Sequence, residues 1–342
     1  MSPGLTRGYT DGAMASELKP FRIGPVRVDF PVVLAPMAGY TDLAYRLICR
    51  QRGAEYCTSE MVLDRCALIH GKLRSRLLCL DPGDHPVGGQ LIGNEPEVMA
   101  EAARAMEQIG FDVVDLNFAC PVHKALSRRR GGHMMRESEQ VLRIVRAVRA
   151  AVDCPVTLKV RRSFDEADRE CEAFWRIAEG AFDAGADALT LHTRSVEAKY
   201  AGRADWELLA RVKGHFADKT IIGSGDVLRP ADALAMLEQT GVDAAAVARG
   251  CLGNPWFFRQ TADLAAGREP YRASLAEQRE LLLEHLEAAC KLYGRLRGPR
   301  IMRKFGIKYA RLHPHPKEVR MAFVDVKSPE DWRAVVEEHY PA

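Results

Sequence analysis

The sequence lacks the features that mark several classes of protein. No apolar run is long enough for a membrane-spanning helix or the core of a signal peptide, and residues 1–20 are polar and glycine-rich. The nine cysteines form no CxxC pair and no finger-like spacing with histidine. This odd number of scattered thiols indicates a reducing cytoplasm rather than a disulfide framework or a zinc site. We therefore expect a cytoplasmic protein without membrane or metal partners, with residues 1–20 as a disordered extension.

The length and composition indicate one large soluble domain with an appendage. The chain has 342 residues, of which 47% are hydrophobic and 28% are charged, as in ordinary soluble enzymes. Its formal net charge is only +3. This total becomes informative when the charges are followed along the chain.

Short apolar runs alternate with amphipathic stretches over residues 21–268. The runs are Val32–Pro36, Tyr56–Met61, Val87–Ile92, Val113–Phe118, Val156–Val160, Ala188–His192, Thr220–Gly223 and Ala244–Ala248. The stretches with helical spacing include Glu97–Ile109, Glu139–Val152, Cys171–Ala184, Trp206–Phe216 and Ala231–Thr240. Because parallel strands need crossover helices, eight such units predict an α/β fold of the (β/α)8 TIM barrel type.

An open, doubly wound sheet is the structural alternative. That fold predicts a glycine-rich phosphate loop after the first strand, whereas the first run here leads into Ala35-Pro36-Met37-Ala38-Gly39. No GxGxxG follows a strand-like run. The barrel is therefore favoured.

The strand pattern stops near Glu269, and residues 269–342 predict a separate C-terminal helical domain. Its helical patterns are Leu275–Tyr293, Arg300–Leu312 and Asp331–His339. Residues 291–320 contain ten lysines and arginines against one glutamate, so the rest of the chain is net negative. A solvated helix face would explain such a run, but its one-sidedness favours a polyanion partner. We expect a basic domain that binds a polyanion such as RNA.

Polar or reactive side chains follow nearly every predicted strand. In parallel barrels, the C-terminal ends of the strands and the loops after them build the active site. These residues are Pro36, Met37, Ala38, Glu60, Gln90, Asn117, Cys120, Lys159, Arg161, His192, Arg194, Ser224, Gly225, Asp226, Arg249 and Gly250. Their convergence on one face predicts a ligand site.

The last two strands carry a pattern that is typical of phosphate binding. Gly223-Ser224-Gly225-Asp226 and Ala248-Arg249-Gly250 would offer backbone N–H groups and a guanidinium at the usual phosphate position of barrel enzymes. The alternative is that the glycines only make tight turns and that Arg249 is a surface residue. The pair of turns favours a phosphate-bearing cofactor, and FMN fits better than a dinucleotide.

Two further strand residues predict contacts with such a cofactor. Lys159 alternates with apolar neighbours and should point into the barrel mouth. A buried ammonium needs an acceptor, for which a flavin carbonyl or a barrel carboxylate would serve. His192, at a strand end beside Arg194, is either structural or part of the site.

Cys120 is the candidate reactive group, because it follows a strand end beside Asn117. A cysteine is more often a small buried hydrophobe, but a thiol that keeps its proton at neutral pH can act as a general acid. The loop after it is strongly basic, with His123, Lys124, Arg128, Arg129, Arg130, His133 and Arg136. It is either a flexible exposed loop or a phosphate clamp that becomes ordered when RNA binds.

Together these motifs resemble the tRNA-dihydrouridine synthase family, and its bacterial B-type members in particular. The segments that carry the resemblance are Ala35–Asp42, Asn117–Lys124, Val156–Arg161, His192–Arg194, Gly225–Asp226 and Arg249–Trp256. They stay in order from about residue 20 to the C-terminal helices, so the resemblance covers nearly the whole chain.

The resemblance implies an FMN-dependent reduction of uridine in RNA, most simply tRNA, to dihydrouridine by a monomer. Reduced flavin, recharged by NADPH, would pass a hydride to C6 of the uracil, and Cys120 would protonate C5. The residues implied for FMN are Pro36, Met37, Ala38, Gln90, Lys159, His192, Ser224, Gly225, Asp226, Ala248 and Arg249. Those implied for the substrate are Asn117, Lys124, Arg161 and Arg194.

Departures from the family pattern leave the substrate open. Ala119, Ser224 and Ala248 stand where the family usually has Gly, Asn and Gly, which should leave FMN binding possible. The stretch Thr193–Ala198 lacks the second arginine and the glutamine usual there. The choice of uridine, and of transfer or ribosomal RNA, therefore stays open. The functional alternatives are an FMN reductase of a small molecule and a non-catalytic RNA-binding protein.

Overall fold

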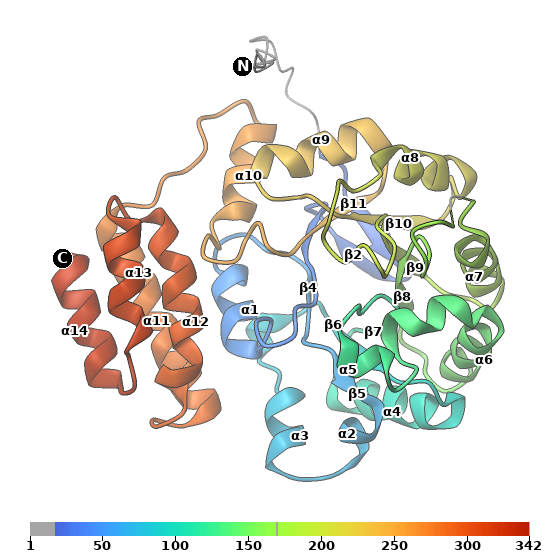
Figure 1. Cartoon of the computed structure of the whole chain (residues 1–342), viewed down its shortest axis with the longest axis horizontal. Helices are drawn as coiled ribbons and strands as arrows, with labels where there is room; N and C mark the ends of the chain where they lie inside the picture. Colours follow the sequence, from blue (N-terminus) through green and yellow to red (C-terminus); the bar gives the residue numbers. More distant parts are fainter. Residues whose placement is uncertain (1–17, 169, 342) are drawn as a thin grey trace.

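The computed structural model of the chain describes residues 18–168 and 170–341, and it has a closed parallel barrel at its centre (Figure 1). Within these residues the barrel strands are β3 (Val32–Leu34), β4 (Cys57–Thr58), β6 (Val87–Ile92), β7 (Val113–Asn117), β8 (Val156–Arg161), β9 (Ala188–His192), β10 (Thr220–Ser224) and β11 (Ala244–Val247). Neighbours pair in parallel in chain order, and β11 pairs with β3, which closes the barrel. The predicted TIM barrel is confirmed.

The second barrel strand is interrupted. The sequence predicts one strand over Tyr56–Met61, whereas the structure has β4 followed by a separate β5 (Val62–Leu63), and both pair with β6. Between them, the Ser59 N–H donates to the Gly88 carbonyl at 2.8 Å, and the Ser59 hydroxyl accepts from the Gln90 N–H at 3.1 Å. The serine hydroxyl thus replaces a ladder hydrogen bond where the strand breaks.

Helices surround the barrel, because each strand buries both of its faces and needs an apolar layer outside it. They are α1 (Leu43–Arg50), α2 (Asp64–Leu68), α3 (Lys72–Leu77), α4 (Pro96–Ile109), α5 (His123–Leu126), α6 (Ser138–Arg149), α7 (Glu172–Asp183), α8 (Trp206–His215), α9 (Pro230–Thr240) and α10 (Phe257–Ala265). The buried face of α4, for example, presents Met99, Ala103 and Met106 to the core. That helix ends at Gly110, whose φ of 109° would strain any side chain.

A short hairpin covers the N-terminal end of the barrel, and the sequence analysis did not predict it. Its strands are β1 (Phe21–Ile23) and β2 (Val26–Val28), which pair antiparallel. Phe21, Ile23 and Val28 are buried in a cluster with side chains of the barrel interior. This end of the barrel is therefore filled with apolar side chains, which leaves the C-terminal strand ends as the place for a ligand.

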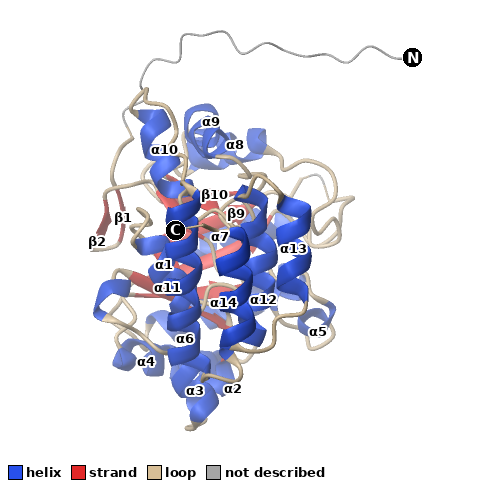
Figure 2. Cartoon of the chain, turned by 90° about the vertical axis from the view of Figure 1, so that its left-hand side faces the viewer, coloured by secondary structure: helices blue, strands red, loops and turns tan. Residues whose placement is uncertain are grey.

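The C-terminal residues form a bundle beside the barrel (Figures 1 and 2). Its helices are α11 (Leu275–Tyr293), α12 (Gly298–Tyr309), α13 (Pro316–Val324) and α14 (Pro329–His339), with a 3-10 turn η3 (Ala310–Leu312). Trp332 is fully buried at its centre, with its ring centroid 4.6 Å from that of Phe323. The predicted helices are present, and α13 is an addition to them.

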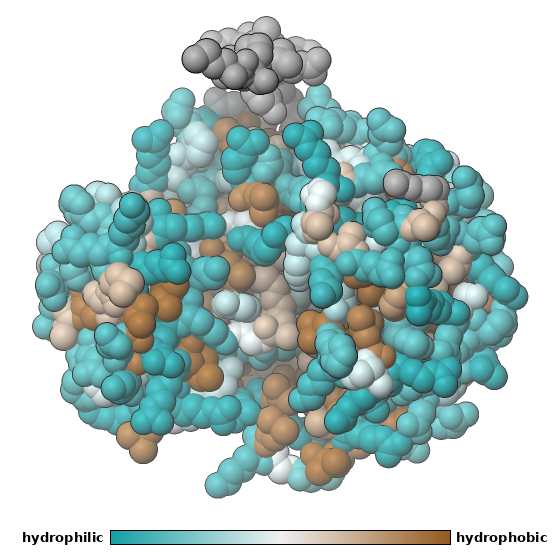
Figure 3. Space-filling view, in the orientation of Figure 1, coloured by the Kyte–Doolittle hydropathy of each residue, from teal (hydrophilic) through white to brown (hydrophobic). Residues whose placement is uncertain are grey.

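The outer surface is mostly hydrophilic over both the barrel and the bundle, with apolar side chains in the furrow between them (Figure 3). Among the described residues, no helix has the length and apolar character needed to cross a membrane. Residues 1–17 of the predicted disordered extension lie outside the described residues, and residues 18–20 lead into β1.

Candidate functional site

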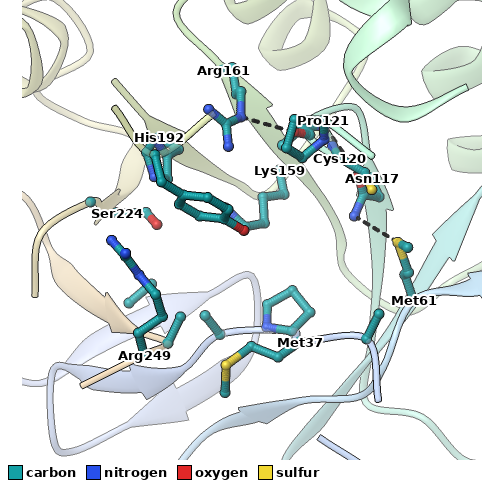
Figure 4. A pocket seen from close by; sticks show the side chains of 18 of the residues that line it. Met37, Met61, Asn117, Cys120, Pro121, Lys159, Arg161, His192, Ser224 and Arg249 are labelled. Atoms are coloured by element: carbon teal, nitrogen blue, oxygen red, sulfur yellow. Dashed lines mark hydrogen bonds between the residues drawn. The ribbon is translucent and has the colours of Figure 1, made fainter. Parts of the chain in front are cut away.

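A cavity of about 340 Å³ opens at the C-terminal ends of the barrel strands (Figure 4). This volume is typical of a small-molecule site. It brings together fourteen of the residues singled out from the sequence. They are Pro36, Met37, Ala38, Gln90, Asn117, Cys120, Lys159, Arg161, His192, Ser224, Gly225, Asp226, Ala248 and Arg249. Lys124 and Arg194 are not among the lining residues.

The thiol and the two glycine turns lie on opposite sides of this cavity. In Figure 4, Cys120 and Asn117 come from the end of β7, while Ser224 and Arg249 come from the ends of β10 and β11 across the opening. Lys159, on β8, lies between these two sides. The arrangement could hold a flat ligand whose phosphate sits at one wall and whose reactive ring faces the other.

Cys120 is buried, with 8% of its surface exposed. Burial raises the pKa of its thiol above the usual value, and the Val122 N–H and Arg161 only partly oppose this effect. The thiol therefore keeps its proton at neutral pH, as a general acid must. The Asn117 side-chain oxygen accepts from the Cys120 N–H at 3.0 Å, which fixes the backbone that carries the thiol.

A buried hydrogen-bond chain orients Asn117 from below. The Asn117 amide donates to the Gln90 side-chain oxygen at 2.8 Å, and the Gln90 amide donates to Asp115 at 2.6 Å. Thr157 also donates to Asp115, at 2.6 Å. Desolvation raises the pKa of Asp115 to about 6, although Thr157 and Gln90 oppose it. Because the side-chain amide atoms of Asn117 and Gln90 all have defined partners, the Asn117 side chain has one favoured orientation.

Lys159, in the cavity wall, gives the clearest indication that the cavity binds a ligand. It is partly buried and makes no hydrogen bond or ion pair with any residue that the structure describes. Burial, and then the nearby Arg161, lower the pKa of Lys159 to about 8. The sequence left open whether a barrel carboxylate would pair with this lysine; no such pair forms, and its ammonium faces the cavity. An unpartnered ammonium there fits a carbonyl or ring nitrogen of a bound ligand.

His192 is held as a neutral hydrogen-bond donor. Burial, and then the positive charges of Lys159 and Arg161, lower the pKa of His192 to about 2. Its Nδ1 accepts from the Arg194 N–H at 3.3 Å, so the ring proton is on Nε2. The Nε2–H can therefore donate to an acceptor in the cavity.

The turns after β10 and β11 fit an anion. Within the described residues, the backbone N–H groups of Gly225, Asp226 and Arg249 donate to no other residue. Both turns line the cavity, and the Arg249 guanidinium is half exposed beside them. Free N–H groups together with a guanidinium are the donors that a phosphate requires. The residues present thus fit a cofactor with a phosphate and a carbonyl-bearing ring, as FMN has.

The Asp226 carboxylate does not belong to that donor set, because it anchors the neighbouring loop. Its two oxygens accept from the same Arg194 nitrogen, Nη2, at 2.7 and 2.8 Å, and one of them also accepts from the Ala204 N–H at 2.8 Å. Burial alone would raise its pKa, but the Ala204 N–H and Arg194 lower it below the usual value. Arg194 itself is buried, with carbonyls of Ala201 and Gly202 as further partners. The structure therefore places Arg194, which the sequence suggested for substrate, behind the cavity wall.

The sequence analysis assigned both Arg161 and Lys124 to the substrate, but the structure places these two residues differently. Arg161 is buried and donates to the carbonyls of Ala119, Ser195 and Lys199 at 2.7–3.0 Å, so it ties the loop of Cys120 to the loop after β9. Burial lowers its pKa to about 10. Lys124, on α5, is exposed outside the cavity.

The basic loop after Cys120 is folded in the chain alone, in contrast to the disorder that both sequence interpretations assumed. It forms α5 and a 3-10 turn η2 (Gly131–Arg136). The Gly132 N–H donates to the Cys120 carbonyl at 2.9 Å. Gly131 has a φ of 58°, and a Cβ there would lie 2.9 Å from the Cys120 Cβ. Backbone packed this closely under the thiol needs glycine.

The sequence analysis missed several residues that line the cavity. Tyr200, in the loop after β9, lies under the Arg249 guanidinium, which is 4.8 Å from the ring centroid. Tyr40 and Met61 also line the cavity, and the Met61 sulfur lies 3.7 Å from the Asn117 amide nitrogen. No strand pattern marks a loop tyrosine as part of a site, since its position depends on how the loop folds back.

The sequence as a whole matches one family of enzymes. The sequence model of the family described as dihydrouridine synthase (Dus) matches residues 33–341. The chain belongs to the dihydrouridine synthase family. This confirms the family that the motifs suggested, and with it the prediction of an oxidoreductase.

Relatives within the dihydrouridine synthase family cover nearly the whole chain. The tRNA-dihydrouridine synthase B of Xanthomonas campestris pv. campestris is 37% identical over 327 residues, which is 94% of this chain and 96% of that protein. That of Pseudomonas aeruginosa is 36% identical, covering 88% of this chain and 90% of its own length. The resemblance to B-type members is thereby confirmed.

Solved structures of other enzymes share the barrel of this dihydrouridine synthase family member. A 2-naphthoyl-CoA reductase complex aligns with a TM-score of 0.58 and 14% identity, covering 73% of this chain and 52% of that one. Histamine dehydrogenase from Rhizobium sp. 4-9 aligns with a TM-score of 0.55 and 16% identity, covering 79% and 50%. At such low identity the likeness concerns the fold alone, and the chain spans about half of each.

Proposed function

We propose that the protein reduces specific uridines in tRNA to 5,6-dihydrouridine, with FMN as its cofactor and NADPH as the electron donor. Family membership supports the reaction, and the similarity to tRNA-dihydrouridine synthases B supports tRNA over ribosomal RNA. The observation that carries the proposal is a single cavity lined by a protonated thiol, a lysine without a partner among the described residues, and two turns whose backbone N–H groups can bind an anion.

The residues proposed to bind FMN fall into groups that contact its phosphate, its ring and the rest of the molecule. The backbone N–H groups of Gly225 and Arg249, with the Arg249 guanidinium, would bind the phosphate. The Lys159 ammonium and the His192 Nε2–H would donate to acceptors of the ring. Gln90, Ser224, Ala248 and the segment Pro36–Ala38 would shape the rest of the pocket. When bound, reduced FMN supplies the hydride that the uracil accepts at C6.

Side chains of the protein would donate the proton and position the uracil. Cys120 holds a proton at neutral pH and gives it to C5, so that the C5=C6 double bond is reduced by one hydride and one proton. Asn117, fixed through Gln90 and Asp115, would hold the base against the thiol. A uracil reaches such a cavity only after leaving its stack, which is least costly in a loop of folded RNA.

The helical residues 269–342 would hold the RNA while the barrel of residues 21–268 does the chemistry. Arg300, Lys317 and Arg320 are exposed and form no ion pair with a described residue. Lys124 and Arg128, beside the cavity, are likewise exposed. These side chains can approach phosphates without first breaking an internal contact, which favours binding of a polyanion.

The test is reduction of RNA by the purified protein. The chain should purify yellow, and with NADPH it should form dihydrouridine in tRNA taken from cells that lack this gene. The same assay with ribosomal RNA and with free uridine separates the alternatives. Turnover of a small molecule without RNA turnover would contradict the proposal, and so would a protein that takes up no flavin.

A further inference from the structure

The helical bundle reaches the rim of the cavity through α12 and the 3-10 turn η3 that follows it. It packs against the turns that follow β3 and β11, two neighbouring strands of the barrel. Both turns line the cavity, at Met37–Ala38 and Ala248–Arg249. The contacts that join α12 and η3 to these turns involve two of the basic residues that the sequence assigned to RNA.

The first contact holds the turn after β3. Gly39, at its tip, has a φ of 78°, its N–H donates to the Glu60 carboxylate, and its carbonyl accepts from the Lys304 ammonium. Lys304 also lies 4.9 Å from the centroid of the Tyr40 ring. Both backbone groups of Gly39 are thus held by side chains of opposite charge, one from the barrel and one from the bundle.

Aromatic packing reinforces this contact. The Phe305 ring, on α12, meets the Tyr40 ring edge to face at 5.4 Å and the Tyr45 ring at 5.2 Å. The Tyr45 hydroxyl donates to the Cys251 carbonyl at 2.7 Å, so the same cluster reaches the turn after β11. Tyr40 itself lines the cavity.

The second contact holds the turn after β11. The Arg311 guanidinium donates to the Gly250 carbonyl at 2.6 Å, directly beside Arg249. At Gly253 a Cβ would lie 2.2 Å from the Lys308 carbonyl oxygen, so the end of α12 and this turn are in backbone contact. The helix therefore braces the backbone on both sides of the site proposed for FMN.

We propose that Lys304 and Arg311 are positioning residues of the cofactor site, through which the helical bundle sets FMN affinity before any RNA is bound. This inference rests on the proposed function. Without Lys304, the Gly39 carbonyl loses its partner and the Glu60 carboxylate keeps only the weaker influence of Arg46, so the turn Met37–Thr41 loosens. Without Arg311, the Gly250 carbonyl is released beside Arg249.

The test compares the full-length variants Lys304→Met and Arg311→Met with Arg300→Met, which removes an exposed charge one turn before Lys304 on α12. FMN is removed and rebound, and flavin fluorescence is followed in the absence of RNA. We expect roughly tenfold weaker FMN binding for Lys304→Met, the scale of one lost charged hydrogen bond, and a similar direction for Arg311→Met. Arg300→Met should bind as the wild type does. Lys304→Arg, which keeps a cationic donor, should recover part of the loss.

Hydrogen exchange of the flavin-free proteins provides the second readout. Amides of the peptides covering 37–41 and 249–253 should exchange faster in Lys304→Met and Arg311→Met, respectively, than in Arg300→Met. Equal FMN affinity in all variants, with a wild type that binds FMN, would overturn this inference alone. Exchange that rises throughout the bundle would also overturn it, because it would indicate general unfolding. A wild type that binds no FMN would overturn the proposed function as well.

Discussion

The barrel mouth and the outer face of the helical bundle use charged side chains in different ways. At the mouth, Arg161 and Arg194 are buried with several carbonyl or carboxylate partners each, and Lys159 points into the cavity without a partner among the described residues. On the bundle, Lys317 and Arg320 extend into solvent. Under the proposed function, the mouth acts through fixed geometry, whereas the outer face of the bundle acts through summed charge. Single substitutions should therefore have large effects at the mouth and small, salt-dependent effects on the bundle.

The largest effect is expected at the thiol. Cys120→Ala removes the proton donor, and turnover of RNA should fall by roughly 10²–10⁴-fold, the usual contribution of a general acid. FMN content, read from the visible spectrum, should stay near that of the wild type. Cys154→Ala, at a partly buried cysteine outside the cavity, is the matched control. Unchanged turnover in Cys120→Ala would remove the acid role from this residue.

The next effect is expected at Lys159, and it depends on pH. The pKa of its ammonium is lowered to about 8, so in the flavin-free protein the charge is lost as the pH rises through 8. If the ammonium holds FMN, affinity should fall between pH 7.5 and 9.5, by up to about tenfold per unit above 8. Fluorescence titration of FMN measures this change. Lys159→Met should bind FMN more weakly at pH 7.5 and show a flat profile; a sloping profile in this variant would assign the titration to another group.

A smaller effect is expected on the bundle. Lys317→Ala and Arg320→Ala should each weaken RNA binding a few-fold and reduce the slope of log affinity against log salt by about one unit or less. Turnover at saturating RNA should be unchanged, since neither residue lines the cavity. Arg104→Ala, an exposed arginine of the barrel helix α4, is the control. An equal loss in the control would mean that binding follows net charge rather than this face.

The smallest effect is expected at Tyr200. The Arg249 guanidinium lies over its ring at 4.8 Å, and an exposed contact of this kind contributes about 0.5–1 kcal/mol. Tyr200→Leu should weaken FMN binding by about two- to fivefold, whereas Tyr200→Phe should keep most of the affinity. Calorimetric titration of FMN measures both. A much larger loss in Tyr200→Leu would show that the ring itself contacts the ligand.

Regular elements were predictable from the sequence where their pattern was long. The run Ala188–His192 and the helix Leu275–Tyr293 have the predicted bounds, because buried parallel strands and amphipathic helices repeat apolar residues at distinct periods. The hairpin Phe21–Val28 was missed, since three-residue strands are too short to show a period. Helix α13, Pro316–Val324, was hidden by its basic residues, and only packing of Val319 and Phe323 against the bundle defines it.

The sequence by itself determined that nearly every strand end would present polar or reactive residues at one rim, because parallel strands place their C-termini on the same side. Which of these residues face the cavity depended on the tertiary structure. Arg194 lies only two residues beyond His192, the last residue of β9, yet the loop folds it onto Asp226, while Tyr200 from the same loop enters the rim. In the same way, nothing in the sequence distinguishes Lys304 and Arg311 from the other positive charges of the segment 291–320. Only the docking of α12 and η3 against the barrel gives them the carbonyls of Gly39 and Gly250 as partners. Periodicity reports on neighbours a few residues apart, whereas these contacts join segments about 60 to 265 residues apart.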